Sequence, residues 1–474
     1  MTEGGGLVLL QAEVACPGKT VSDGKEQQRV PRVAGRKRTH HHRYAQRGPD
    51  GMQQAIARIA VLLQVEGEKL VVRIEFTVCG HCATLLEKAL PRGEKCTTHK
   101  AESAYVTINS NDSKEGWLKL MKIGILTGGG DCPGLNAVIR AVVRKGILHY
   151  EDEFVGFMEG WRGVLENKTM VLDYDSISGI LPRGGTILRT SRTNPAKREG
   201  GLSRCIETFK QHKLDALIAI GGDDTNSVGQ KLFEQGINVV GVPKTIDNDL
   251  SGTDFCFGFD TAVNTAMEAI DRVHTTAEAH QRVMVVEVMG RDAGWMAMYS
   301  GIAGGADVIL IPEKPFDIEE VAERIRLRHA RGRYFSIIVV AEGAKFASDV
   351  EPHGAPVVTE MGKDEFGHVR LGGVGQILAR EVERRTGLET RYVVLGHIQR
   401  GGSPSAFDRV LASRYGIGAI DMVHRGEFGC MVALRGNAIV SVPLTEAINK
   451  NRLVDPALVD VALGLSEPLK SEKK

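Results

Sequence analysis

Residues 121–147, MKIGILTGGGDCPGLNAVIRAVVRKGI, contain the pattern that decides the fold. The run KIGIL is apolar throughout, as a strand inside a parallel sheet requires. It ends in TGGGD at 127–131, and helical spacing of apolar residues follows over 135–147. A strand, a glycine turn and a helix in this order point backbone N–H groups at an anion. Because no Gly-Lys-Ser/Thr follows the turn, it is not a Walker loop.

Two further apolar runs end in polar loops of the same kind. LDALIAI at 214–220 leads into GGDDTNS at 221–227, and VVGV at 239–242 leads into PKTIDND at 243–249. Adjacent carboxylates repel each other in a structural turn, whereas beside a Mg²⁺ ion they are suitable oxygen ligands. Because open α/β sheets bind ligands at the carboxyl ends of their strands, the three loops predict one site for phosphate groups.

The composition is that of a globular α/β protein. The 474 residues are 42% hydrophobic and include 56 glycines, and 60 basic residues nearly balance 59 acidic ones. No run of 18 apolar residues is present, and the N-terminus does not resemble a signal peptide, which excludes membrane and secreted classes. The eight cysteines are too dispersed for a disulfide framework. We expect a cytoplasmic protein with no membrane partner.

Residues 1–120 differ from the remainder of the chain in composition and in the spacing of apolar residues. The segment 18–51 is polar and basic with little periodicity, which predicts disorder. The spacing of apolar residues predicts a helix over 53–63 and a strand over 70–78. The basic run lacks interleaved aromatic residues, so we expect no nucleic-acid partner. We interpret 1–120 as an N-terminal extension of unknown role, partly disordered.

One group of residues in this extension has the spacing of zinc ligands. The order is C-x2-C followed by C-x2-H, formed by Cys79, Cys82, Cys96 and His99. The alternative is that the extension reflects an upstream start without any function, and this is the interpretation that we favour.

Five motifs spread along the chain together resemble the phosphofructokinase family. They are GGGDCPGLNA, GGDDT, PKTIDNDL, HQRVMVVEVMGRDAGW and LGHIQRGGSPSAFDR, in the family's order and with similar spacing. The resemblance implies two Rossmann-like α/β domains with the active site in the cleft between them. It places a phosphoryl-donor domain at 121–258, a fructose 6-phosphate domain at 259–403, and segments that cross back between the two domains at 404–474.

The resemblance implies transfer of a phosphoryl group to the 1-hydroxyl of fructose 6-phosphate, in glycolysis and gluconeogenesis. Asp247 matches the family's proton acceptor for that hydroxyl, and a carboxylate suits this role because it is ionised at neutral pH. Asp249 and Thr245 match residues that hold the metal–phosphate geometry, and Asp223 matches the carboxylate associated with Mg²⁺. Arg192 matches the arginine that neutralises the phosphoryl group in flight.

Later motifs are implied to bind the sugar phosphate, and Arg291 is also implied to lie near the transferred group. Arg282 and Arg391 match arginines that reach in from a neighbouring subunit, so a homodimer or homotetramer with shared active sites is expected. Bidentate arginine suits the geometry of phosphate. The residues that match substrate contacts within the chain are Thr245, Ile246, Asp247, Met289, Gly290, Arg291, Glu342, His397, Ile398, Gln399 and Arg400.

Two departures from the commonest ATP-dependent pattern indicate the phosphoryl donor. The second loop reads GGDD where ATP-dependent members usually have GGDG, and Lys244 stands where they usually have glycine. Together Asp224 and Lys244 resemble the pyrophosphate-dependent branch. The Asp224 carboxylate would occupy the place of a nucleotide's α-phosphate, and such a like-charge contact costs several kcal/mol. The donor contacts implied by the resemblance are Gly129, Gly130, Asp224, Thr225 and Lys244.

Two alternatives remain within the family. An ATP-dependent enzyme is opposed by Asp224, and a catalytically silent regulatory subunit is opposed by the presence of the base, the metal carboxylate and both arginines of the transfer step. Relative to shorter members of the family, the chain has extra sequence at 343–373, which we expect to be a surface excursion.

Overall fold

The computed structural model describes residues 120–347, 355–363, 365–367, 369–448, 450–466 and 468, and the backbone of five strands nearer the N-terminus. The chain divides into two compact units, Met1–Leu118 and Lys119–Lys474. Within the described part of the chain, no helix combines the length and the apolar composition needed to cross a bilayer.

The five strands of the first unit form an antiparallel sheet in the order β1-β2-β3-β5-β4. The helix predicted over 53–63 is wrong, because this stretch lies in β2, which hydrogen-bonds to β1 and β3 on either side. Pairing on both edges overrides the helical spacing. The strand predicted over 70–78 is confirmed as β3. The bounds are Leu7–Val14 for β1, Ala55–Glu66 for β2, Lys69–Thr77 for β3, Cys96–Thr98 for β4 and Ala104–Asn109 for β5.

Two predictions for the first unit concern residues without a described structure. The segment 18–51, predicted to be disordered, lies outside the described residues. So does the proposed zinc-ligand set, except for the backbone of Cys96 in β4.

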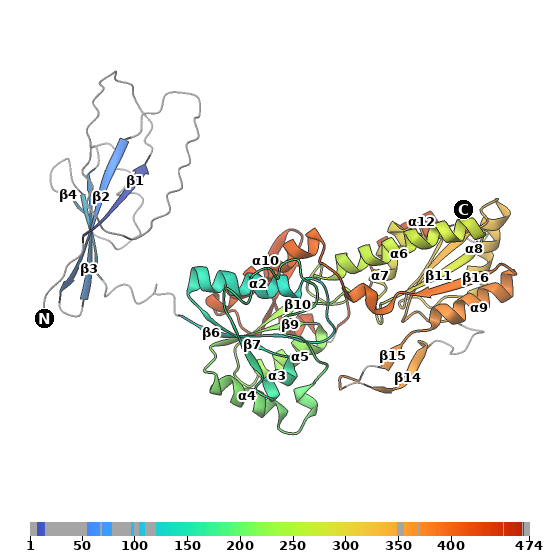
Figure 1. The fold of residues 1–474 in the computed structure, drawn as a ribbon, viewed down its shortest axis with the longest axis horizontal. Helices are drawn as coiled ribbons and strands as arrows, with labels where there is room; N and C mark the ends of the chain where they lie inside the picture. The colour runs from blue at the N-terminus through green and yellow to red at the C-terminus, as the bar shows by residue number, and fades with distance from the viewer. Residues whose placement is uncertain are drawn as a thin grey trace, which may run out of the picture. The chain divides into compact units, whose positions relative to one another are not determined.

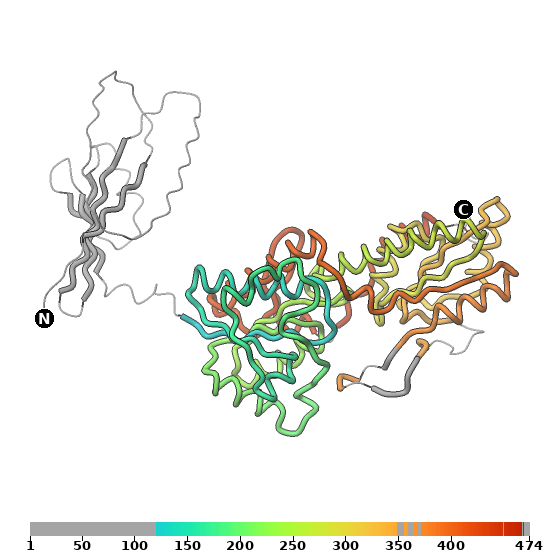
Figure 2. Tube along the Cα trace, viewed as in Figure 1, coloured from blue at the N-terminus to red at the C-terminus, as the bar shows by residue number. Residues whose placement is uncertain are grey.

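The second unit begins with a seven-stranded sheet in the order β18-β17-β10-β9-β6-β7-β8. Its five central strands are parallel, and the two edge strands pair antiparallel. Every residue of β9 and β10 is buried, as strands covered on both faces require. Figure 2 shows that the C-terminal part of the chain returns to this sheet to add β17 and β18. The bounds are Lys122–Thr127 for β6, Glu153–Phe157 for β7, Thr169–Leu172 for β8, Ala216–Gly221 for β9, Val239–Pro243 for β10, Cys430–Arg435 for β17 and Ala438–Pro443 for β18.

Helices cover both faces of this sheet (Figure 1). On one face α2 (Leu135–Lys145) and α10 (Ala406–Arg425) join the apolar cluster of the central strands. On the other, α3 (Trp161–Leu165), α4 (Gly201–Gln211) and α5 (Asp223–Phe233) enclose a second cluster. The sheet is therefore the middle layer of a three-layer α/β sandwich.

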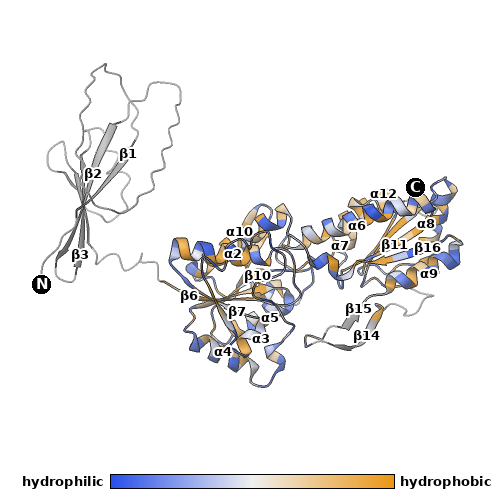
Figure 3. Cartoon of the chain, in the orientation of Figure 1, coloured by the Kyte–Doolittle hydropathy of each residue, from blue (hydrophilic) through white to orange (hydrophobic). Residues whose placement is uncertain are grey.

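A second, four-stranded parallel sheet has the order β12-β13-β11-β16. The helices α6 and α7 pack on one face, and α8 and α9 on the other. Figure 3 shows hydrophobic residues concentrated on the strands of both sheets. The bounds are Val283–Val288 for β11, Val308–Leu310 for β12, Ser336–Ala341 for β13, Thr390–Val394 for β16, Phe259–His280 for α6, Trp295–Ala303 for α7, Ile318–Ala330 for α8 and Val374–Thr386 for α9.

Shorter elements connect and extend these layers. The fold class predicted from the sequence, two α/β halves with parallel sheets, is confirmed by this arrangement. The remaining elements are the π-helix η2 (Gly146–Tyr150), the 3₁₀ helices η3 (Pro195–Lys197) and η4 (Gly396–Arg400), the strands β14 (Val358–Lys363) and β15 (Val369–Leu371), and the helices α11 (Leu444–Ala447) and α12 (Pro456–Leu465).

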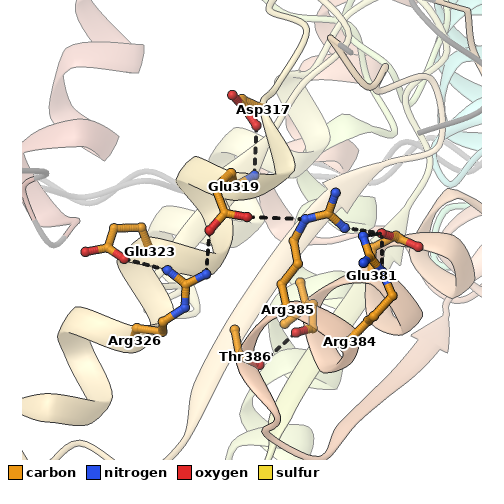
Figure 4. Close-up of polar contacts among 9 residues, drawn as sticks. Asp317, Glu319, Glu323, Arg326, Glu381, Arg384, Arg385 and Thr386 are labelled. Atoms are coloured by element: carbon orange, nitrogen blue, oxygen red, sulfur yellow. Dashed lines mark hydrogen bonds and ion pairs between the residues drawn. The ribbon is translucent and has the colours of Figure 1, made fainter. Parts of the chain in front are cut away.

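Ion pairs join α8 and α9 on the outer side of the second sheet (Figure 4). Arg385 of α9 lies 3.4 Å from Glu319 of α8 and also pairs with Glu381 of its own helix. Arg326 pairs with Glu319 at 2.5 Å and with Glu323 at 2.6 Å. The two pairs of Arg326 are exposed, and exposed pairs contribute about 0–1 kcal/mol each. The apolar cluster beneath the two helices therefore supplies most of their stability.

The contact between α10 and α2 offers a direct test of the packing. A Cβ at Gly416 of α10 would lie 2.7 Å from the Ala141 Cβ and 2.7 Å from the Val138 carbonyl oxygen. Gly416→Ala forces the helices apart, and we expect the free energy of unfolding to fall by about 2 kcal/mol in urea denaturation. Gly464→Ala in α12, where an added Cβ meets nothing within 4 Å, is the matched control and should not destabilise the protein. Equal stability of the two variants would contradict the close helix contact.

Candidate active site

The three polar loops begin at one edge of the seven-stranded sheet. Thr127 at the end of β6 lies opposite Ile220 of β9, and Gly221 of β9 lies opposite Pro243 of β10. The Gly128 N–H donates to the carbonyl of Ile220 at 2.9 Å. Because the strands are parallel and in step, their following loops converge on the same region.

Side chains from two other segments pack closely against the glycine turn after β6. A Cβ at Gly128 would lie 2.5 Å from Thr225 Oγ1, and a Cβ at Gly130 would lie 2.5 Å from Arg400 Nη1. Gly129 between them has φ +79°, in the left-handed region that glycine adopts readily. Space therefore favours glycine at 128, where the Thr225 side chain is close, and backbone conformation favours it at 129, whereas a side chain at 130 would displace the Arg400 guanidinium.

A cavity of about 230 Å³ lies at this edge and receives residues from both α/β halves. All of its lining residues are predicted from the sequence except Gly222, Asp292, Phe366 and Asn451. The complete lining is Gly129, Gly130, Arg192, Gly222, Asp223, Asp224, Thr225, Lys244, Thr245, Asp247, Asp249, Arg291, Asp292, Phe366, Arg400 and Asn451.

Of the four lining residues that the sequence analysis did not predict, two lie inside recognisable motifs and two do not. Asp292 directly follows Arg291 inside the GRDAGW motif, and Gly222 lies inside GGDDT, so both motifs contain the signal. Phe366 lies in the stretch predicted to be a surface excursion, and Asn451 lies beyond the last motif. No local pattern marks either of these two residues.

Asp247 is a buried carboxylate that lines the cavity. Its Oδ1 atom is buried and has no hydrogen-bond partner. Burial raises the pKa of Asp247, and the positive charges of Arg400, Arg291 and Lys244 oppose that rise. The Asp247 backbone N–H donates to Thr245 Oγ1 at 3.0 Å, which fixes the turn that carries the carboxylate. A buried carboxyl group with a raised pKa at a cavity is a candidate for a functional residue.

Lys244 is a buried cation beside the glycine turn. Its side chain is hidden from solvent, and its Nζ donates a hydrogen bond to the Gly130 carbonyl. Burial lowers the pKa of Lys244, and the charges of Asp131 and Asp247 act in the opposite direction. An anion bound in the cavity would favour the charged ammonium further.

Two more carboxylates near the cavity have strongly raised pKa values. Burial, followed by the charge of Asp247, raises the pKa of Asp249 to about 7. The same two causes, in the same order, raise the pKa of Glu342 to about 7, although Arg291 opposes the rise. Glu342 follows β13 directly and does not line the cavity itself. Burial is thus the first cause of both shifts, and the neighbouring Asp247 charge is the second.

Of the sugar-phosphate residues predicted in η4, one lines the cavity and the others do not. In η4, Arg400 lines the cavity and its Nη1 donates to the Asp131 carbonyl at 3.3 Å. His397 and Ile398 of the same helix are exposed, whereas Gln399 is buried and donates to the Gly396 carbonyl at 3.2 Å. The structure thus places Arg400 at the cavity, but not His397, Ile398 or Gln399.

Three residues predicted to contact the substrate, Ile246, Met289 and Gly290, do not line the cavity. Ile246 is fully buried in the apolar core, and Met289 is 8% exposed. Gly290 has φ +136°, and a Cβ there would lie 2.9 Å from the Ala293 carbonyl oxygen. These residues can support the site through their backbone or their packing, and they do not line the cavity.

Arg282 and Arg391 lie away from the cavity of their own chain. Both pair with Glu389, at 2.8 Å from Arg282 Nε and at 2.6 Å from Arg391 Nη2. Arg391 is exposed and Arg282 is partly so. One carboxylate thus holds the two guanidinium groups side by side.

The carboxylates of the cavity suit a magnesium ion bound together with phosphates. In the part of the chain that the structure describes, no group of three His, Cys, Asp or Glu side chains is placed to hold a metal by itself. Mg²⁺ usually binds through one or two carboxylates plus substrate phosphates and water, and Asp223 beside a cavity with room for phosphates fits this pattern.

Two parallel sheets whose loops meet at a cavity of glycine turns, cations and carboxylates define an enzyme that handles phosphate groups. The family model described as phosphofructokinase matches residues 122–423. The chain belongs to the phosphofructokinase family.

The relatives include users of two different phosphoryl donors. The pyrophosphate–fructose 6-phosphate 1-phosphotransferase of Streptomyces coelicolor is 58% identical over 341 residues, which are 72% of this chain and 98% of that protein. The ATP-dependent 6-phosphofructokinase of Mycobacterium tuberculosis is 53% identical over 343 residues, with the same two coverages. A pyrophosphate-dependent phosphofructokinase from Marinobacter aquaeolei has the same fold, with a TM-score of 0.61, 23% identity and coverage of 74% of this chain and 94% of that one.

Glu342 leads to a prediction about stability and pH. Its ordinary pKa is 4.5 and its pKa in the folded protein is about 7, so ionisation destabilises the folded state as the pH rises through this window. Glu342→Gln removes that cost, and the variant should gain stability relative to the unmodified protein by about 2 kcal/mol between pH 5 and pH 8. Urea denaturation at both pH values measures the gain. A stability difference that does not change with pH would contradict the raised pKa.

Proposed function

We propose that this chain catalyses reversible phosphoryl transfer from pyrophosphate to the 1-hydroxyl of D-fructose 6-phosphate, giving D-fructose 1,6-bisphosphate and phosphate. The observation that carries the choice of donor is the presence of Asp224 and Lys244 in one cavity. Lys244 places its charge against the glycine turn, where a small polyanion lacking a nucleoside gains most from it. Asp224, in the first turn of α5, repels a third phosphate.

The free oxygen of Asp247 supports its role as the proton acceptor. As the 1-oxygen of the sugar attacks the phosphorus of pyrophosphate, Asp247 takes the hydroxyl proton, and the bond to the bridging oxygen breaks to release phosphate. Arg192 and Arg291, both at the cavity, stabilise the charge that spreads over the transferred group. Arg400 supplies a further cation on the side of the second sheet.

Mg²⁺ belongs to this proposal as the cofactor. Asp223 would hold it, with the phosphate oxygens of the donor completing the coordination. When bound, the ion neutralises charge on the phosphate groups and orients the donor.

A shared active site in a homodimer or homotetramer also belongs to the proposal. Arg282 and Arg391 lie outside their own cavity and are held together by Glu389, as expected of groups that serve a neighbouring subunit. We further propose domain boundaries at 120/121, 258/259 and 403/404, and a cytoplasmic location.

An ATP-dependent enzyme is the second candidate, favoured by the relatives of that name at 53% identity. The two identities lie too close to decide the donor, so the content of the cavity decides it. A silent regulatory subunit is disfavoured because Asp223, Asp247, Arg192 and Arg291 all line one cavity.

The donor is tested by offering pyrophosphate and ATP separately with fructose 6-phosphate and Mg²⁺. We expect turnover with pyrophosphate alone. Asp224→Gly should introduce ATP-dependent turnover and reduce kcat/KM for pyrophosphate by about tenfold, because the like-charge contact with a nucleotide disappears while the order of the donor loop is disturbed. Asp224→Asn, which keeps the shape and removes the charge, is the matched variant. Turnover of the unmodified enzyme with ATP but not with pyrophosphate would refute the assignment.

The role of Asp247 is tested by Asp247→Asn, which keeps the side-chain shape but cannot accept the proton. We expect kcat to fall about 10³-fold while KM for fructose 6-phosphate changes little, as for removal of a general base. Asp254→Asn is the control, since Asp254 lies outside the cavity and accepts a hydrogen bond from the Gly436 N–H at 2.6 Å. Retention of more than about a tenth of the activity in Asp247→Asn would assign the proton transfer to another group.

A further inference from the structure

The β14–β15 hairpin is more than the surface excursion expected of this stretch. Its strands pair antiparallel, and it extends from the side of the second sheet toward the first half (Figure 1). The residues at its tip, Glu365 and Phe366, contact the first half at the donor side of the cavity. A segment from one half thus closes part of a site whose donor loops come from the other.

Glu365 anchors the tip. Its carboxylate accepts a hydrogen bond from the Asn194 backbone N–H at 2.8 Å and pairs with the Arg198 Nη2 at 2.7 Å. Asn194 lies two residues after Arg192, which lines the cavity. A carboxylate at the rim of an anion site is unfavourable unless it is paired. The Arg198 guanidinium neutralises the Glu365 carboxylate, and the bond from Asn194 ties the tip to the segment that carries Arg192.

Phe366 forms an apolar section of an otherwise polar cavity wall. It lines the cavity and packs against the apolar cluster that includes Trp161, Val164 and Cys205 in the first half. An aromatic ring cannot hydrogen-bond to phosphate oxygens in the way that the neighbouring cations do. Its contribution is to occupy space and to exclude water from the donor.

We propose that Phe366 is a donor-specificity residue, held in place by Glu365. Its ring covers a small donor on the Arg192 side and occupies the space through which the nucleoside of a nucleotide would extend. This inference rests on the proposed pyrophosphate-dependent activity. It gives the cavity two separate barriers, because Asp224 opposes a third phosphate whereas Phe366 opposes the nucleoside attached to it.

Two competitive inhibitors separate the two barriers. Tripolyphosphate has a third phosphate and no nucleoside, and ATP has both. The full-length enzyme is assayed with pyrophosphate, with each inhibitor in turn, as the unmodified protein and as the variants Phe366→Ala, Phe366→Leu and Glu365→Gln. The matched controls are Tyr334→Ala, an aromatic residue that is 50% exposed, and Glu427→Gln, which breaks the exposed pair with Arg425.

For Phe366→Ala we expect the inhibition constant of ATP to fall about tenfold and KM for pyrophosphate to rise about tenfold, each corresponding to about 1.4 kcal/mol. The inhibition constant of tripolyphosphate and KM for fructose 6-phosphate should stay within about twofold, a difference that general loosening of the fold cannot produce. Glu365→Gln should change the same two constants in the same direction, because the anchor is weakened. Both controls should match the unmodified enzyme.

Two outcomes would overturn the inference while leaving the proposed function intact. One is unchanged inhibition by ATP in Phe366→Ala, and the other is an equal gain for ATP and tripolyphosphate. Phe366→Leu keeps most of the apolar packing, so its ATP inhibition decides the matter if the alanine variant is unstable. Absence of pyrophosphate turnover in the unmodified enzyme is a distinct result, which rejects the proposed function itself.

Discussion

The close packing around the glycine turn after β6 is the constraint on which the site depends. Thr225, from the second loop, and Arg400, from the second α/β half, both lie so near the turn that neither Gly128 nor Gly130 could carry a side chain without displacing them. Lys244, from the third loop, hydrogen-bonds to the backbone of the same turn. The turn is therefore the point at which three loops and both halves meet, and it fixes where Lys244 and Arg400 lie at the cavity.

Several ionisable groups are buried around this turn, and burying a charged group lowers the stability of the folded protein. Burial raises the pKa values of Asp247, Asp249 and Glu342, the Asp247 charge raises the latter two further, and Lys244 is buried as well. Such strain is typical of functional sites, where the surrounding structure maintains an arrangement unfavourable on its own. The Lys244 Nζ donates a hydrogen bond to the Gly130 carbonyl, and the charges of Asp131 and Asp247 partly offset the effect of burial on its pKa.

Much of this site could be predicted from the sequence, because the donor loops are continuous motifs at the ends of buried strands. Asp223, Asp224, Lys244 and Asp247 all line the cavity that their motifs imply. The remainder depends on long-range packing that leaves no local pattern. The reach of the hairpin to Asn194 joins residues 171 positions apart, and Asn451 comes to the cavity through a bridge to Leu250. The helix predicted over 53–63 is wrong for a related reason, since pairing with two neighbouring strands decided the structure there.

Asp224 and Phe366 line the cavity, and the donor proposed for it has no nucleoside, so the reverse reaction is the most direct test. Fructose 1,6-bisphosphate, inorganic phosphate and Mg²⁺ are incubated with the full-length enzyme, and the products are followed by ³¹P NMR. We expect a growing pyrophosphate signal together with fructose 6-phosphate, in the absence of any nucleotide. No pyrophosphate under these conditions, with ATP formed when ADP replaces phosphate, would contradict this expectation.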